Sequence, residues 1–159
     1  METGVMEGLL GYYKRAMKLK EADVDTYSPL VLAYIGDAVY EVMVRTKVVN
    51  RGNVQVSKLH KSSSHLVCAQ AQARMTHLLQ ERLTSEELAV LKRGRNAKSA
   101  TSAKNASITE YRLATGFEAL VGWLFLSEQF ERLIGLVSYG LERIEEEAPG
   151  AKPLQEQSL

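Results

Sequence analysis

The chain has 159 residues, of which 45% are hydrophobic and 25% charged, and its formal net charge is +1. This length predicts one domain with a working hydrophobic core and excludes a second sizeable one. Cys68 is the only cysteine, which excludes an internal disulfide framework or a cysteine zinc site and favours a reducing cytoplasm. Charged residues interrupt every apolar segment before it is long enough to span a membrane.

Six helical stretches are predicted, three of them in the first half of the chain. The first covers residues 5–20, where apolar residues recur at helical spacing. The second begins with Ser28 as its cap and Pro29 at its first position, and it stops near Gly52. The third covers about 54–82 and is read as one long helix or two.

Two capping boxes begin helices in the second half. Thr84–Glu87 opens a short helix, and Ser107–Glu110 opens a longer one that ends near residue 127. A last helix covers about 129–146. The sequence therefore predicts a single all-α domain over residues 1–147, followed by a disordered tail at 148–159.

Carboxylates interrupt two otherwise apolar helices. Asp37 and Glu41 lie four apart on the second helix, so they share one face, and Glu118 lies in the apolar run 114–126. An ionised carboxylate is costly to bury without a partner. If the two helices pack together, Asp37 and Glu118 face each other and favour a shared cation such as Mg²⁺, which suits phosphodiester hydrolysis. A solvated helix edge, or an arginine partner from elsewhere, is the open alternative.

Three small residues also bear on packing. Gly36 and Gly122 lie inside the same two helices, where glycine costs about 1 kcal/mol relative to alanine. Two explanations remain open: the glycines allow close helix packing, or the helices merely tolerate them. Cys68 is predicted to be a small core residue.

A basic stretch without any acid covers residues 92–107. Its composition predicts a mobile loop that lays positive charge over a phosphate backbone, and the absence of aromatic residues favours double-stranded RNA over single strands. A solvated surface loop is the alternative. The predicted RNA-binding residues are Lys92, Arg93, Arg95, Asn96, Lys98 and Lys104.

The segments YIGDAVYE (34–41) and FEALVGWLFL (117–126) resemble the two signature stretches of the ribonuclease III catalytic domain. The further segments SPLVLAYIGDAVYE, SKLHK and KRGRNAKS resemble its compact bacterial branch, Mini-ribonuclease III, which lacks an appended double-stranded-RNA-binding domain. The resemblance covers about residues 27–146.

The resemblance implies an all-helical endonuclease domain that works as a homodimer, paired through the helix that carries Asp37. It implies Mg²⁺-dependent cleavage of double-stranded RNA and maturation of the large-subunit (23S) ribosomal RNA precursor. Asp37 and Glu118 fall on the two signature acids, so they are the expected catalytic residues and metal ligands. A ribosomal protein is left open as an assisting partner.

Two positions depart from the family pattern. Ala33 and Thr115 stand where typical members have acids. Glu41 and Glu110 are left open as substitutes. The missing acids motivate an alternative function, which is a non-catalytic double-stranded-RNA-binding or ribosome-assembly protein on the same fold.

Overall fold

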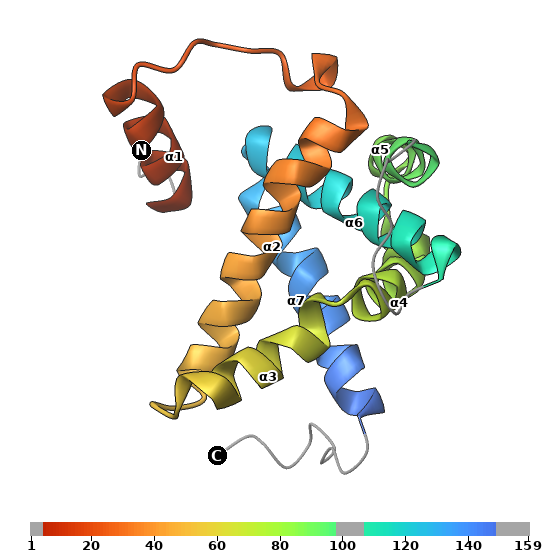
Figure 1. Ribbon diagram of the computed structural model, residues 1–159. Coiled ribbons are helices and arrows are strands. Elements are labelled where there is room, and N and C mark those ends of the chain that lie inside the picture. The colour runs from red at the N-terminus through yellow and green to blue at the C-terminus, as the bar shows by residue number, and fades with distance from the viewer. Residues whose placement is uncertain (1–4, 98–106, 149–159) are drawn as a thin grey trace.

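The computed structural model describes residues 5–97 and 107–148, and this part of the chain contains helices and no strand (Figure 1). The helices are α1 (Val5–Ala16), η1 (Val24–Thr26), α2 (Pro29–Asn50), α3 (Val56–Val67), α4 (Ala69–Leu79), η2 (Gln80–Arg82), α5 (Ser85–Asn96), α6 (Ile108–Leu126) and α7 (Phe130–Glu147). The prediction of an all-α fold is confirmed. The predicted disordered tail lies outside the described residues, apart from residue 148.

The predicted helix starts are present. The Ser28 hydroxyl accepts a hydrogen bond from the backbone N–H of Val31 at the start of α2, with Pro29 in the first turn. Thr84–Glu87 and Ser107–Glu110 both form reciprocal capping boxes, at the starts of α5 and α6. These local signals therefore fix where the helices begin.

The first helix is shorter than the sequence indicates, because α1 ends at Ala16. Lys18 adopts the left-handed conformation with φ 55°. The N–H of Leu19 donates to the Lys14 carbonyl at 2.9 Å, and that of Lys18 donates to the Arg15 carbonyl at 3.1 Å. This pair of bonds is a Schellman motif, which terminates the helix without a glycine.

The stretch 54–82 contains two α-helices, which meet at Cys68. Cys68 is extended, with ψ 160°, so the path of the chain changes between α3 and α4. The hydroxyl of Tyr40 on α2 donates to the Leu66 carbonyl at 2.7 Å and holds the end of α3. Cys68 itself is exposed, so its prediction as a core residue is wrong.

The predicted loop after Leu91 is wrong for its first residues, because α5 continues to Asn96. Gly94, which favours a loop in isolation, is buried against α6. A Cβ on Gly94 would lie 2.8 Å from Ala119 Cβ and 2.9 Å from Gly116 Cα. Close packing against another helix therefore sustains α5 through this glycine.

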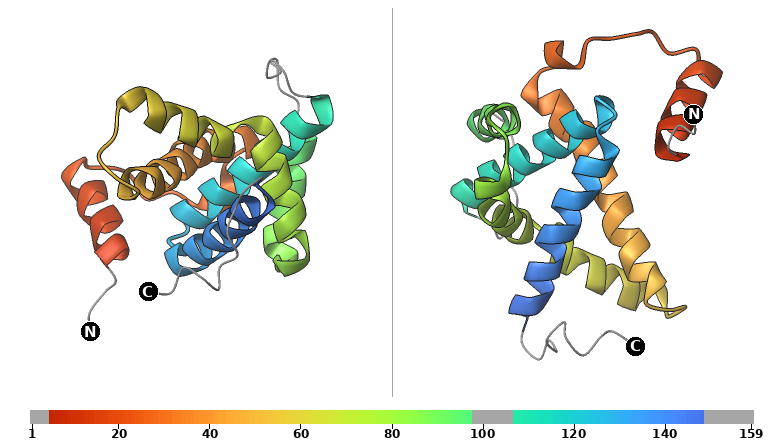
Figure 2. Two further views of the ribbon diagram at one scale, coloured as in Figure 1. Left: turned by 90° about the horizontal axis from the view of Figure 1, so that it is seen from below. Right: turned by 180° about the vertical axis from the view of Figure 1, so that it is seen from behind.

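Helix α6 lies at the centre of the fold. It packs against α2, α4, α5 and α7, as the three ribbon views show (Figures 1 and 2). Every residue from Ala114 to Leu124 is buried except Glu118. Tyr40 of α2 meets Phe117 of α6 edge to face, with 4.9 Å between ring centroids. No helix in the described residues is long and apolar enough to cross a membrane.

The tightest helix contact is the crossing of α2 and α6 at two glycines. A Cβ on Gly36 would lie 1.7 Å from the carbonyl oxygen of Glu118, and one on Gly122 would lie 1.9 Å from the carbonyl oxygen of Leu32. No side chain fits at either position unless the backbones separate. The two glycines therefore serve close packing, not simple tolerance.

We expect Gly36→Ala to destabilise the protein by more than about 3 kcal/mol, because the added methyl group forces α2 away from α6. Urea unfolding followed by circular dichroism measures this change. Gly135→Ala is the matched control. Nothing lies within 4 Å of a Cβ on Gly135 in α7, so alanine should stabilise that helix by about 0.5–1 kcal/mol. Equal effects of the two variants would contradict the role of the crossing.

Candidate active site

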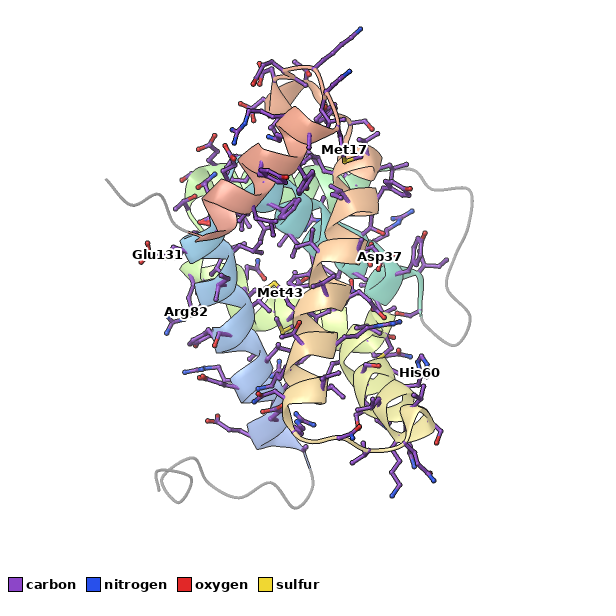
Figure 3. The ribbon with its side chains drawn as sticks, turned by 90° about the vertical axis from the view of Figure 1, so that its left-hand side faces the viewer. Met17, Asp37, Met43, His60, Arg82 and Glu131 are labelled. Carbon is purple, nitrogen blue, oxygen red and sulfur yellow. The ribbon has the colours of Figure 1, made fainter. Side chains whose placement is uncertain are left out.

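The α2–α6 crossing brings together the two acids that the sequence singled out. Asp37 directly follows Gly36, whose Cα lies against the backbone of Glu118. Figure 3 shows Asp37 on the side of α2 that faces α6, away from α7. Asp37 is exposed and Glu118 is partly buried, so solvent reaches the pair from the side of Asp37, while Glu118 borders the core.

The two carboxyl groups influence each other's ionisation. Burial raises the pKa of Glu118 to about 7, and the negative charge of Asp37 contributes in the same direction. Burial also raises the pKa of Asp37, with a further contribution from Glu41. Among the described residues neither acid has an ion-pair partner. The pair is therefore short of positive charge.

The neighbouring acids have other partners. Glu41 forms an ion pair with Arg45, with 2.8 Å between Oε1 and the guanidinium nitrogen. The Glu110 carboxylate accepts a hydrogen bond from the N–H of Ser107 at 3.3 Å and so caps α6. Glu41 is near enough to Asp37 to raise its pKa, but its own charge is balanced by Arg45, and Glu110 is used as a helix cap.

The two positions that lack the family's acids are packed into the protein. Ala33 is 5% exposed and Thr115 is 8% exposed. The hydroxyl of Thr115 donates to the Tyr111 carbonyl at 3.0 Å. Within the described residues, no group of three or more His, Cys, Asp or Glu side chains is arranged to hold a metal ion.

This donor set fits a hydrated divalent cation. Mg²⁺ in phosphate-processing sites takes one or two carboxylates and completes its shell with water and phosphate oxygens. Two unpaired carboxylates whose pKa values are raised gain free energy from a shared cation, since it offsets both their burial and their repulsion. A site built only of protein ligands would need more donors than these helices supply.

Sequence reasoning missed Gln72, a buried residue of α4. Its side-chain amide lies close enough to Glu118 to lower the pKa of that carboxyl, which opposes the larger effect of burial. A signal was present, because residues 69, 72, 73, 76 and 79 follow helical spacing, and Gln72 and Thr76 are polar members of that stripe.

The predicted RNA-binding residues divide into two groups. Lys92, Arg93, Arg95 and Asn96 lie in the last two turns of α5, whereas Lys98 and Lys104 lie outside the described residues. Lys92, Arg93 and Asn96 are exposed, and Arg95 is partly buried. Because Gly94 packs against α6, this basic helix end is fixed to the helix that carries Glu118.

Several known proteins are similar to this chain over most of its length. The sequence profile of the Ribonuclease III domain matches residues 30–129. The chain is 48% identical over 125 residues to a Mini-ribonuclease 3 of Clostridium tetani, covering 78% of this chain and 83% of that protein. It is 42% identical over 140 residues to a Mini-ribonuclease 3 of Thermoanaerobacter, covering 88% and 99%.

The chain belongs to the ribonuclease III family. Its relatives place it in the Mini-ribonuclease 3 group, so it is a ribonuclease III-type endoribonuclease, from a family of nucleases that act on double-stranded RNA. A crystal structure of a Fusobacterium nucleatum protein is similar as well, with TM-score 0.70 and 27% identity over 78% of this chain and 99% of that one. The comparisons thus favour the nuclease over the non-catalytic alternative.

For this ribonuclease III domain we expect metal-free Glu118→Gln to be more stable than the unmodified protein at pH 8, by about 2 kcal/mol. Because the folded-state pKa of Glu118 is raised to about 7, its ionised form opposes folding. The contribution of Glu118 to stability is present below its unfolded-state pKa and is lost as the pH rises through about 7.

Urea unfolding with a chelator at pH 5 and pH 8 measures this difference, which should largely vanish at pH 5. Glu131→Gln is the control, since Glu131 is exposed on α7 and lies on the other side of α2 from Asp37 in Figure 3. A stability gain that is the same at both pH values would show that Glu118 is not desolvated.

Proposed function

We propose that the protein is a Mg²⁺-dependent endoribonuclease that cuts double-stranded RNA with Asp37 and Glu118. The observation that carries this proposal is the glycine crossing, which brings one unpaired acid from each of two apolar helices together at an opening to solvent. The family's general use of divalent metal ions supports the choice of cofactor.

In this proposal the carboxylates of Asp37 and Glu118 would together hold the ion at the crossing of α2 and α6. Mg²⁺ bound there lowers the pKa of water and stabilises negative charge on a phosphodiester. Asp37, being exposed, lies on the substrate side, whereas the partly buried Glu118 anchors the ion to the core. Both carboxyl groups must be ionised, so metal affinity falls as the pH drops below about 7, the pKa of Glu118.

The basic end of α5 would hold the RNA. Lys92 and Arg93 are exposed there, and Arg95 donates from Nε to the side-chain oxygen of Asn96 at 3.3 Å. Phosphate contacts of this kind need no particular base sequence, which suits a duplex recognised by its shape. Lys98 and Lys104, which follow α5 in the sequence, are proposed as RNA-binding residues as well.

We also propose a homodimer paired through the start of α2. Three apolar side chains are exposed there: Leu30 at 40%, Val31 at 48% and Tyr34 at 82%. An aromatic residue so exposed, beside two aliphatic ones, is typical of an interface core. Two-fold pairing would supply one site for each strand of a duplex. A sedimentation experiment that finds only monomer at micromolar concentration would contradict this.

The proposed natural substrate is the precursor of large-subunit (23S) ribosomal RNA, processed in the cytoplasm. This choice over duplex RNA in general follows from the resemblance to Mini-ribonuclease III, which implies this precursor as the substrate. Cells that lack the protein should accumulate 23S RNA with extended ends. Mature ends in such cells would contradict this substrate.

Asp37→Asn should abolish cleavage of a long RNA duplex, by a factor of about 10³ or more, because the amide cannot hold the ion as a carboxylate does. Its affinity for the duplex without metal should change less than twofold. Gel assays of cleavage with and without Mg²⁺, and of binding with a chelator, measure both quantities. Glu131→Gln is the control and should cleave normally. Cleavage by Asp37→Asn at the normal rate would rule out this site.

The double variant Lys92→Ala with Arg93→Ala should weaken duplex binding and reduce the slope of log affinity against log salt by about 2, since each lost phosphate contact lowers it by about 0.9. The double variant Arg51→Ala with Arg74→Ala removes the same charge from residues already paired with Glu145 and Glu147. Salt slopes from filter binding should differ between the two. Equal slopes would place the RNA contacts elsewhere.

A further inference from the structure

Gln72 is a buried amide of α4 that lies close to Glu118. Its side chain is 2% exposed, and its neighbours Ala71, Ala73, Met75 and Thr76 are buried as well. Burying a primary amide costs free energy unless its donors and acceptor are satisfied, and it also costs the conformational entropy of a long side chain. An apolar residue would be buried here at a lower cost in free energy, so the presence of an amide indicates a role beyond packing.

The two ends of this amide are used differently. Nε2 donates to the carbonyl oxygen of Val67 at 3.0 Å. The same amide lies close enough to the Glu118 carboxyl to lower the pKa of that group. Oε1 is buried and has no hydrogen-bond partner in the described part of the chain. Buried polar atoms without a partner are rare in native structures, and they concentrate where a ligand or water completes the set. The donor side is satisfied, and the acceptor side is not.

Gln72 is also held in place by the break between α3 and α4, which α2 fixes in turn. Its Nε2 binds the carbonyl at the α3–α4 break, and the preceding carbonyl, that of Leu66, accepts the hydroxyl of Tyr40. Tyr40 lies one helical turn after Asp37 and packs edge to face on Phe117, the residue before Glu118. The amide therefore keeps a fixed position relative to both carboxylates.

The chemistry of the position favours an amide over a charged residue. A lysine or arginine would neutralise the carboxylate pair and compete with a cation, whereas a third carboxylate would add to the repulsion at Glu118. A neutral amide donates to the carboxylate and accepts from a second donor without changing the net charge. Among uncharged side chains of this length, glutamine alone carries both groups.

We propose that Gln72 is a positioning residue of the nuclease site, whose Nε2 orients the Glu118 carboxylate and whose Oε1 accepts a hydrogen bond from water beside the bound divalent ion. The inference rests on the proposed metal site of Asp37 and Glu118. Residues that orient a metal-binding carboxylate in this way typically change metal affinity by 10- to 100-fold when they are replaced.

The first test is Mn²⁺ binding by calorimetry to full-length Gln72→Met, which keeps the length and loses the amide. We expect Mn²⁺ affinity to fall about 10-fold or more, and the Mg²⁺ concentration needed for half-maximal cleavage to rise in parallel. Thr76→Val is the matched control, since Thr76 is 1% exposed, lies one turn further along α4 and donates to main-chain carbonyls, those of Gln72 and Leu113. Affinity close to the unmodified value in Gln72→Met would overturn the proposal.

A second test needs no substitution at Gln72. The side-chain NH₂ resonances of Gln72 in ¹H–¹⁵N spectra should shift on addition of Mg²⁺, with the same midpoint as metal binding, and Asp37→Asn should remove the shift. No shift during saturation overturns the proposal even if Gln72→Met fails to fold. If Asp37→Asn binds Mn²⁺ normally, the proposed metal site is wrong and the role of Gln72 falls with it. If Asp37→Asn loses binding and Gln72→Met does not, only the role of Gln72 is wrong.

Discussion

The contact between α2 and α6 at Gly36 and Gly122 determines the rest of this structure. At both glycines a backbone carbonyl of the other helix occupies the space that a side chain would need. Helices that approach this closely leave no freedom in their relative position, because sliding or rotation would bring larger residues into the contact. The position of Asp37 relative to Glu118 is therefore set by main-chain packing and not by flexible side chains.

That rigidity carries an electrostatic cost. Two carboxyl groups are held near each other, one of them partly withdrawn from water, without an arginine or lysine among the described residues to balance them. Ala33 and Thr115 pack into the core beside them, so this chain keeps the acids closest to the crossing and replaces the flanking ones with small buried residues. A cation then contributes more to this pair than it would to a site already rich in counter-charges.

The parts that could be predicted from the sequence depend on local chemistry. The starts of α2, α5 and α6 follow from caps within four residues. The acids in apolar helices are visible as well, but their meeting is predicted only on the condition that the two helices pack together. The errors depend on distant contacts. The continuation of α5 past Gly94 depends on Gly116, and the exposure of Cys68 depends on a break that Tyr40 holds from another helix. The role of Gln72 needed the three-dimensional neighbourhood of Glu118.

Helix α6 has two glycine contacts, one with α5 at Gly116 and one with α2 at Gly122, and Glu118 lies between them. The basic end of α5 and the acid pair are thus both held in fixed positions by the same helix, α6. In the proposed function, a duplex bound at α5 would be cut at a constant distance along the RNA from the α5 contact. Changing that distance would require a different number of residues between Gly116 and Gly122. A longer side chain on the surface would leave the distance unchanged.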